Sequence, residues 1–188
     1  MSTSATSAVL AGIFVGGASR RMGGTPKGLL VGPDGQTLVA RWRDVFAECG
    51  VPCVLVGAHP AYTGEGMTML ADVAADAGPL AGLGALLERS VVALAVACDM
   101  PFVSAAHVRM LLDAPRAVAV APKREGRWEP FFARYDATLA RPVVQARLEA
   151  GAHSLQGLLD ALGCVELELG ADAGRFLDDW DTPADVAR

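Results

Sequence analysis

A glycine-rich loop over residues 16–28 carries the side chains most able to do chemistry. It contains the cations Arg20, Arg21 and Lys27 and follows the apolar run from Ala8 to Val15 directly. Glycines let backbone N–H groups approach an anion closely, and the cations supply the opposing charge. The loop matches neither a P-loop nor a dinucleotide fingerprint, whose residue spacings differ. It therefore predicts a phosphate-binding site of another kind, in preference to a solvated glycine-rich turn.

A carboxylate follows a second apolar run. Asp99 comes directly after the run Val91–Cys98 and shortly before Pro101. An aspartate at the end of a buried strand can hold Mg²⁺, which takes oxygen ligands and commonly bridges substrate phosphates. By itself this pattern fits a turn before proline equally well. Beside a cationic phosphate loop, the metal becomes the better interpretation, and Asp99 is the predicted Mg²⁺ ligand.

A third candidate segment begins at Asp72 and Asp76 and continues into the glycine-rich stretch 78–84. Gly82 and Gly84 lie where the pattern is helical, and each glycine costs a helix about 1 kcal/mol relative to alanine. Small residues there either let a ligand approach or relieve packing of the helix on its sheet. The sequence leaves both alternatives open.

The chain as a whole is acidic and apolar. Its 188 residues carry a formal net charge of −5, and 52% of them are hydrophobic. This size predicts a single domain over residues 1–188, with 1–7 as a flexible N-terminal tail. The acidic balance argues against nucleic acid as a partner, and no apolar run is long enough to cross a membrane. Cysteine spacing fits no disulfide framework and no signal peptide is visible, so we expect a cytoplasmic location.

Strand-like and helix-like segments alternate along the chain, which predicts an α/β fold with a mostly parallel sheet. In such sheets ligands bind at the carboxyl ends of strands. The glycine-rich loop, Asp72 and Asp99 all fall at such ends. The expected strands cover 8–15, 53–56, 68–70, 91–98, 117–121, 131–135 and 165–169, and the expected helices cover 37–49, 79–89, 104–112, 137–149, 154–162 and a short turn from Thr182-Pro183.

Three motifs in this order resemble the molybdenum cofactor guanylyltransferases. They are Phe14-Val15-Gly16-Gly17-x-Ser19-x-Arg21-Met22-Gly23-x-x-x-Lys27, then Asp72 ahead of Gly78-Pro79-Leu80-Ala81-Gly82, then Cys98-Asp99-Met100-Pro101. The resemblance implies a three-layer Rossmann-like nucleotidyltransferase fold. It also implies an Mg²⁺-dependent transfer of GMP from GTP to the terminal phosphate of molybdopterin, with release of pyrophosphate. GTP and molybdopterin are thus the implied partners, with molybdoenzyme apoproteins or other cofactor-biosynthesis proteins as further ones.

The resemblance also implies roles for single residues. Lys27, Arg21 and Asp99 would be catalytic, with Asp99 holding the metal. Further substrate-binding candidates are Arg20 of the glycine-rich loop, which would serve the pterin phosphate, Glu129 and His153 from segments that resemble parts of the family site, and Asp181 from the closing motif. The nucleotide would contact Phe14, Val15, Gly16, Gly17, Ser19, Lys27, Asp72 and Asp99.

The choice of base rests on small differences. The pair Gly16-Gly17 resembles guanylyl-transferring members and favours GTP. Phe14 and Val15 replace smaller family residues, and we expect them to add bulk beside the base. Asp179 and Asp181 stand where the guanylyl branch has asparagines. Two alternatives therefore stay open: a cytidylyltransferase for molybdopterin or another phosphate-bearing substrate, and a non-catalytic module that binds or delivers a cofactor.

Overall fold

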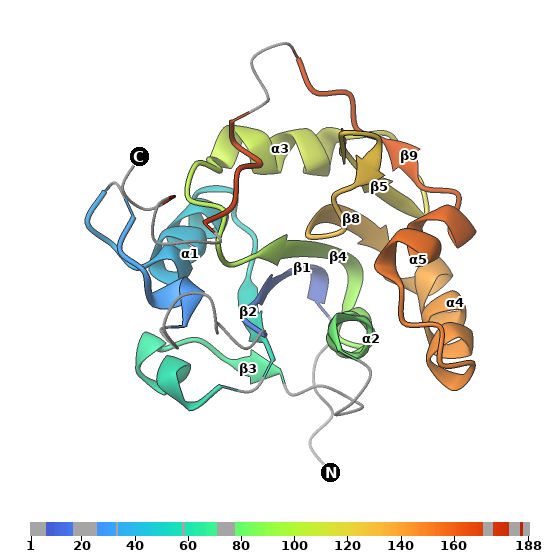
Figure 1. Ribbon diagram of the computed structural model, residues 1–188, viewed down its shortest axis with the longest axis horizontal. Coiled ribbons are helices and arrows are strands. Elements are labelled where there is room, and N and C mark those ends of the chain that lie inside the picture. Colours follow the sequence, from blue (N-terminus) through green and yellow to red (C-terminus); the bar gives the residue numbers. More distant parts are fainter. Residues whose placement is uncertain are drawn as a thin grey trace.

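The computed structural model describes residues 7–16, 26–32, 34–57, 59–70, 78–170, 175–180 and 185. Among them, a seven-stranded sheet lies between two layers of helices (Figure 1). Its strand order is β3-β2-β1-β4-β8-β5-β9. The strands are β1 (Ser7–Phe14), β2 (Cys53–Val56), β3 (Met69–Leu70), β4 (Ser90–Ala97), β5 (Ala119–Ala121), β8 (Phe132–Asp136) and β9 (Val165–Glu166).

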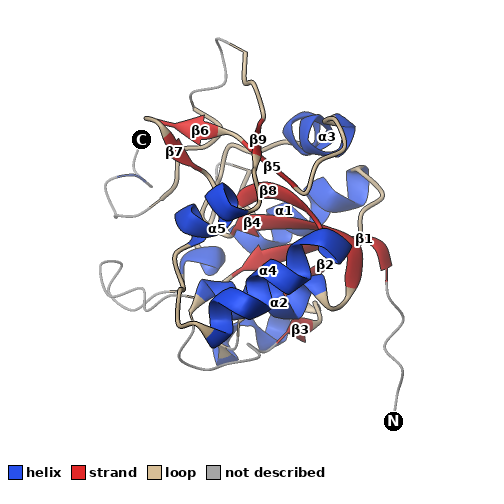
Figure 2. Ribbon diagram, turned by 90° about the vertical axis from the view of Figure 1, so that its right-hand side faces the viewer, coloured by secondary structure: helices blue, strands red, loops and turns tan. Residues whose placement is uncertain are grey.

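Helices cover both faces of this sheet (Figures 1 and 2). The helices α1 (Leu38–Glu48) and α3 (Ala105–Asp113) lie on one face. The other face is covered by α2 (Pro79–Leu87), α4 (Ala137–Glu149) and α5 (Leu155–Ala161). Two 3₁₀ turns, η2 (Lys27–Leu29) and η3 (Pro60–Glu65), lie in the connections. The expected three-layer, mostly parallel α/β fold is confirmed.

Local sequence signals begin most of the helices. The Thr37 hydroxyl accepts the Ala40 N–H at 3.2 Å, and the Asp136 carboxylate accepts the Leu139 N–H at 3.1 Å. Ser154 does the same for Gly157 at 3.2 Å. Each bond satisfies a backbone donor that the first helical turn leaves without a partner. The sequence therefore predicts these starting points well.

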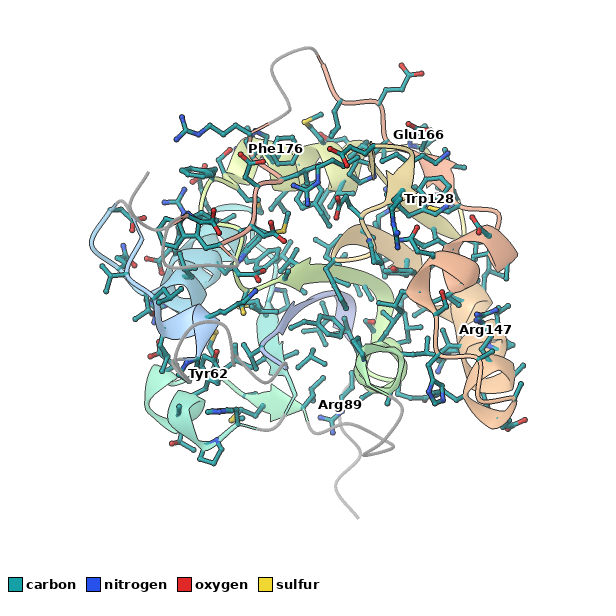
Figure 3. The ribbon with its side chains drawn as sticks, viewed as in Figure 1. Tyr62, Arg89, Trp128, Arg147, Glu166 and Phe176 are labelled. Atoms are coloured by element: carbon teal, nitrogen blue, oxygen red, sulfur yellow. The ribbon has the colours of Figure 1, made fainter. Side chains whose placement is uncertain are left out.

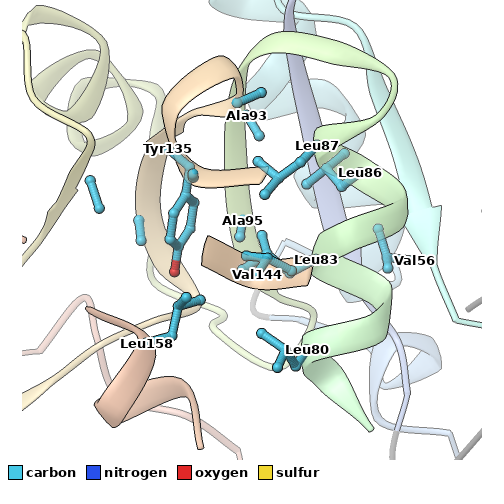
Figure 4. Packing of buried hydrophobic residues seen from close by; sticks show 14 of the residues in the cluster. Val56, Leu80, Leu83, Leu86, Leu87, Ala93, Ala95, Tyr135, Val144 and Leu158 are labelled. Carbon is cyan, nitrogen blue, oxygen red and sulfur yellow. The ribbon is translucent and has the colours of Figure 1, made fainter. Parts of the chain in front are cut away.

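In the described part of the chain, two hydrophobic clusters form the interior, one on each face of the sheet, and Figure 4 shows the cluster in which α2 packs on the strands. Leu80, Leu83, Leu86 and Leu87 of α2 are at most 1% exposed and pack on the strands. A helix that is apolar on nearly all sides must be enclosed on nearly all sides, and α2 packs against both the sheet and the neighbouring helix α4. The buried leucines of α2 thus hold this helix against one face of the sheet.

Two features differ from expectation. The strand predicted at residues 131–135 is β8, and it runs antiparallel to both neighbours, β4 and β5. The segment between β5 and β8 forms a hairpin of β6 (Lys123–Arg124) and β7 (Arg127–Trp128), which the sequence analysis missed. The helix expected from Thr182-Pro183 begins outside the described residues. No described helix has the length and apolar character needed to cross a bilayer.

Candidate active site

The site is built where two neighbouring parallel strands end together. In β1 and β4, Phe14 is paired with Ala97, and the Cys98 N–H donates to the Phe14 carbonyl at 3.2 Å. The chain leaving β1 at Gly16 and the chain leaving β4 at Asp99 therefore start from the same edge. This is the edge at which ligands bind in parallel α/β sheets.

An ion pair joins the two candidate segments. The Lys27 ammonium lies 2.7 Å from the Asp99 carboxylate, although 72 positions separate the residues. Both side chains are partly exposed, at 22% for Lys27 and 14% for Asp99. A cation and a carboxylate thus lie side by side, both partly exposed, at the carboxyl ends of β1 and β4. That is the placement the sequence analysis required of a phosphate and metal site.

Side chains from α1 hold the Asp99 loop at both ends. The Trp42 indole N–H donates to the Ala97 carbonyl at 3.0 Å, and Arg41 donates to the Val103 carbonyl at 3.1 Å. The Trp180 N–H donates to the Asp99 carbonyl at 2.9 Å, so the C-terminal segment contacts the same loop. Sequence reasoning missed these supports, because no local pattern links a residue of α1 to a carbonyl at the end of β4.

Backbone at the end of β1 lies open. Gly16 is exposed, and a Cβ placed there would meet no described atom within 4 Å. Gly57, at a φ of +113°, follows β2, and a Cβ on it would lie 3.3 Å from the Gly16 nitrogen. A side chain at position 57 would therefore be strained and would crowd the Gly16 backbone. Among the described residues, the two glycines keep the space beside the Gly16 backbone free of side chains.

The side chains of Phe14 and Val15 point into the core. They are 8% and 6% exposed, and the Phe14 ring packs against Phe131 with the centroids 4.6 Å apart. The expectation that these side chains add bulk beside the base is wrong. Because β1 is a central strand with helices on both faces, alternating side chains on either face are buried. Any contact of these two residues with a nucleotide must be made by their backbone.

Several predicted site residues lie outside the described residues. These are Gly17, Ser19, Arg20, Arg21, Asp72 and Asp181. Their assigned roles stay predictions. Of the predicted catalytic residues, Lys27 and Asp99 are those whose contacts the structure gives.

Glu129 already has a protein partner. The Arg124 guanidinium donates to it at 2.9 Å and also lies 3.7 Å from Asp178 and 4.0 Å from Asp179. Burial raises the pKa of Glu129, and the Arg124 charge partly offsets this. The hairpin and the C-terminal segment are thus tied together by Arg124. This network connects Glu129 to the site, since Trp180 of the same segment bonds to Asp99.

His153 lies exposed in the turn before α5. The side-chain amide of Gln156, one turn further on, exchanges two hydrogen bonds with the Trp128 backbone, at 2.8 and 3.0 Å. Trp128 directly precedes Glu129, so the start of α5 and Glu129 flank the same hairpin. The structure does not bring His153 to the Lys27–Asp99 pair, and its role stays a prediction.

The thiol in the site is not a nucleophile. Cys98 lies between the end of β4 and Asp99 and is 6% exposed. Burial raises the pKa of Cys98 to about 12, and the nearby Asp99 charge adds to the rise. The thiolate, which is the reactive form, is therefore nearly absent at neutral pH. Burial and this shift therefore argue against Cys98 as a nucleophile.

Comparison with known proteins agrees with this geometry. The family model described as the MobA-like NTP transferase domain matches residues 11–165. The chain belongs to the MobA-like NTP transferase family. The match spans both Lys27 and Asp99.

A relative named molybdenum cofactor guanylyltransferase, from Xanthomonas euvesicatoria, is 31% identical over 182 residues, which is 94% of this chain and 91% of that protein. The resemblance expected from the motifs is confirmed.

Solved structures show how widely this fold is shared. Molybdopterin-guanine dinucleotide biosynthesis protein A from Archaeoglobus fulgidus superimposes with a TM-score of 0.77 at 21% identity, covering 95% of each chain. The 2-C-methyl-D-erythritol 4-phosphate cytidylyltransferase from Thermus thermophilus gives a TM-score of 0.62 at 24% identity, covering 95% of this chain and 94% of that one. At these identities the likeness establishes the fold. Members of the MobA-like family therefore share their architecture with an enzyme named for another base.

Proposed function

We propose that this protein is a molybdenum cofactor guanylyltransferase, which transfers GMP from GTP to the terminal phosphate of molybdopterin. The observation that carries the proposal is the Lys27–Asp99 pair, 2.7 Å apart at the carboxyl ends of β1 and β4. A phosphate-binding cation and a metal-binding carboxylate are the two charges that nucleotidyl transfer needs. The named function of the Xanthomonas relative supports the same activity.

In the proposed reaction, an oxygen of the molybdopterin phosphate attacks the α-phosphorus of GTP. The bond from that phosphorus to the oxygen bridging the α- and β-phosphates breaks, and pyrophosphate leaves. The guanine dinucleotide form of the cofactor results. Such transfers are catalysed mainly by positioning and by neutralising phosphate charge. Lys27 would supply this charge to the phosphate oxygens, and no protein nucleophile is required.

The donor set fits Mg²⁺ only together with substrate. The described residues contain no group of three or more His, Cys, Asp or Glu side chains that could hold a metal. Asp99 offers a single, partly exposed carboxylate. Mg²⁺ commonly binds through one or two carboxylates plus substrate phosphates, so a nucleotide would complete the site. When bound, the ion would offset negative charge on the phosphates, while Asp99 would fix where the triphosphate lies.

Guanine is the base that the proposal assigns. The resemblance of the pair Gly16-Gly17 to guanylyl-transferring members and the name of the Xanthomonas relative support it. The aspartate at position 179 had pointed instead toward the cytidylyl branch. Its carboxylate lies 4.0 Å from Arg124, so an electrostatic contact within the protein accounts for the acid at this position. Asp181, the other aspartate typical of the cytidylyl branch, lies outside the described residues, so the comparison of GTP with CTP decides between the two bases.

The test measures pyrophosphate release with each nucleoside triphosphate, with and without purified molybdopterin. We expect release with GTP that requires molybdopterin, stops on chelation of divalent ions and resumes with Mg²⁺. Lys27→Ala and Asp99→Asn should each lower kcat/KM by about 10²- to 10³-fold, the usual loss when a charge-stabilising group is removed from an active site.

Asp44→Asn is the matched control, because Asp44 pairs with Arg43 on the exposed side of α1. It should retain the wild-type rate. Preference for CTP would overturn the choice of base. Tight pterin binding without pyrophosphate release from any nucleotide would indicate the non-catalytic module instead.

A further inference from the structure

Lys27 lies in a short turn whose own hydrogen bonds are too few to hold it in place. The turn η2 spans only Lys27–Leu29, and no side chain caps its start at Pro26. Its local hydrogen bonds are Leu29 N–H to Pro26 O at 2.9 Å and Leu30 N–H to Lys27 O at 3.0 Å. A turn this short gains too little from its own bonds to be stable alone. The place of Lys27 must therefore come from contacts with the rest of the molecule.

A buried tyrosine supplies such a contact. The hydroxyl of Tyr62 accepts the Gly28 N–H at 3.2 Å, and Tyr62 is 1% exposed. It comes from η3, on the side of the molecule formed by α1, β2 and β3 (Figure 3). A Cβ on Gly28 would lie 3.0 Å from the Tyr62 hydroxyl oxygen and 3.0 Å from its ring carbon Cε1. The absence of a side chain at position 28 is what allows this close approach.

The buried hydroxyl of Tyr62 stays protonated and accepts a hydrogen bond as a neutral group. Burial raises the pKa of Tyr62 above its ordinary value, so the phenol stays neutral. A buried backbone N–H without an acceptor is costly, and the Tyr62 hydroxyl is the oxygen that accepts the Gly28 N–H, which also lies against the Cys98 sulfur. Gly28 follows Lys27 directly, and a shift of its peptide plane would move the Lys27 side chain relative to Asp99.

We infer that Tyr62 is a positioning residue for Lys27. By accepting the Gly28 N–H, its hydroxyl fixes the turn from which Lys27 reaches Asp99 and, in the proposed reaction, the triphosphate. The second part of this inference rests on the proposed function, whereas the first concerns the protein alone.

The first experiment needs no nucleotide. Trace acetylation of the intact protein, followed by peptide mass spectrometry, gives the modification rate of Lys27, with Lys123 as reference in the same sample. Tyr62→Phe should raise the Lys27 rate severalfold, as should Asp99→Asn, which removes the carboxylate charge that pairs with Lys27. Tyr135→Phe is the matched control: it removes the hydroxyl of another fully buried tyrosine, which donates to Pro130 O at 3.0 Å. An unchanged Lys27 rate in Tyr62→Phe would overturn the inference.

The second experiment asks whether Tyr62 acts through Lys27. GTP affinity is measured for Tyr62→Phe, Lys27→Met and the double variant. The single Tyr62→Phe change should weaken binding about fivefold, the effect of one neutral hydrogen bond. In the Lys27→Met background it should have no further effect, because coupled residues are not additive. Additive losses would show a general packing role and would contradict the inference.

A third measurement uses the unaltered protein. The Gly28 N–H should exchange with solvent deuterium slowly, since its acceptor is a buried hydroxyl. Fast exchange would overturn the inference even if Tyr62→Phe failed to fold. If the wild-type protein binds no GTP, the proposed function fails, while the acetylation rates and the exchange rate still decide the role of Tyr62.

Discussion

At the scale of single residues, glycines serve opposite purposes on the two sides of the site. Gly16 is open, with no described atom within 4 Å of a Cβ placed on it. Gly28 is crowded, because a Cβ there would lie 2.6 Å from Cγ1 of Val39 and 3.0 Å from the Tyr62 ring. Gly16 leaves space for a ligand, whereas Gly28 lets the protein close around the Lys27 turn. Both belong to the glycine-rich loop 16–28, and the sequence alone does not distinguish their roles.

Gly28→Ala should therefore destabilise the protein and weaken nucleotide binding together. Inserting a methyl group into a filled site costs about 1–3 kcal/mol, and relief of the clash would move Lys27. Urea denaturation measures the free energy of unfolding, and equilibrium titration measures GTP affinity.

Gly64→Ala is the control for this substitution. Gly64 lies in η3 with no described atom within 4 Å of an added Cβ, and its φ is not positive. It should leave both quantities near their wild-type values. A Gly28→Ala protein with wild-type stability would show that the turn is not packed as described.

At the scale of elements, the reversed direction of β8 follows from its connection. A parallel neighbour requires a crossover of a dozen or more residues, usually a helix. Between Ala121 and Phe132 the chain instead forms the β6–β7 hairpin and returns beside β5. This return makes β8 antiparallel to β5. The hairpin itself contacts the C-terminal segment through Arg124, which donates to the Leu177 carbonyl. The strand itself was predictable, but its direction depended on a hairpin that the sequence analysis did not identify.

Arg134 of β8 connects the sheet to the end of α3. It is 8% exposed, and its guanidinium donates to the carbonyls of Leu111, Leu112 and Ala114 at 2.8–3.0 Å, and to that of Pro115. The last carbonyls of a helix have no partners within it, and a cation there also complements the helix dipole. This single side chain therefore closes the C-terminal end of α3.

Arg134→Leu should lower the free energy of unfolding by about 2–4 kcal/mol, because several buried carbonyls lose their donor. Chemical denaturation monitored by circular dichroism measures the change. Arg141→Leu is the control, since Arg141 lies on α4 and pairs with Glu88 at the surface. Equal effects of the two substitutions would mean that the α3 carbonyls find other donors.

At the scale of the whole molecule, residues 175–180 tie the end of the chain to the site. Phe176, Leu177 and Trp180 are buried, at 3–5% exposure. Figure 3 shows Phe176 beside α3, where its ring stacks on His107 with the centroids 4.0 Å apart. The Trp180 N–H bonds to Asp99, and Arg124 donates to the Leu177 carbonyl at 3.2 Å. The C-terminal segment thus completes the core on the α1–α3 face and supports the Asp99 loop.

The half-buried His107 ring, which stacks on Phe176, should make the free energy of unfolding depend on pH. Burial lowers the pKa of His107 below its ordinary value of 6.5, and its Nδ1 accepts the Ser104 N–H at 3.1 Å. The unfolded chain therefore takes up a proton at a pH where the folded protein does not. The stability that neutral His107 contributes is complete above pH 6.5 and is lost as the pH falls through the folded pKa. Thermal or urea unfolding between pH 5 and 7.5 measures this decline.

His107→Gln removes the titrating group and keeps a side-chain oxygen that can accept the N-cap N–H. The decline of stability below pH 6.5 should become shallower in this variant. His153→Gln, which changes an exposed histidine, should leave the slope as it is in the wild type. An identical slope in His107→Gln and wild type would show that other groups carry the acid sensitivity.

The sequence by itself determined the main helices, the strands of the large sheet and their order along the chain, because alternating apolar runs, helix caps and glycine turns act over a few neighbouring residues; it did not determine the β6–β7 hairpin. It also predicted that the Lys27 loop and Asp99 lie at the same sheet edge, and the structure pairs the two side chains there; their roles in a reaction stay predictions. Only the tertiary structure decided that Phe14 and Val15 face the core and which side chains support the site. Tyr62, Trp42 and Arg124 meet their partners 34, 55 and 53 positions away along the chain. Contacts over such separations depend on how the layers pack, and no local pattern encodes them.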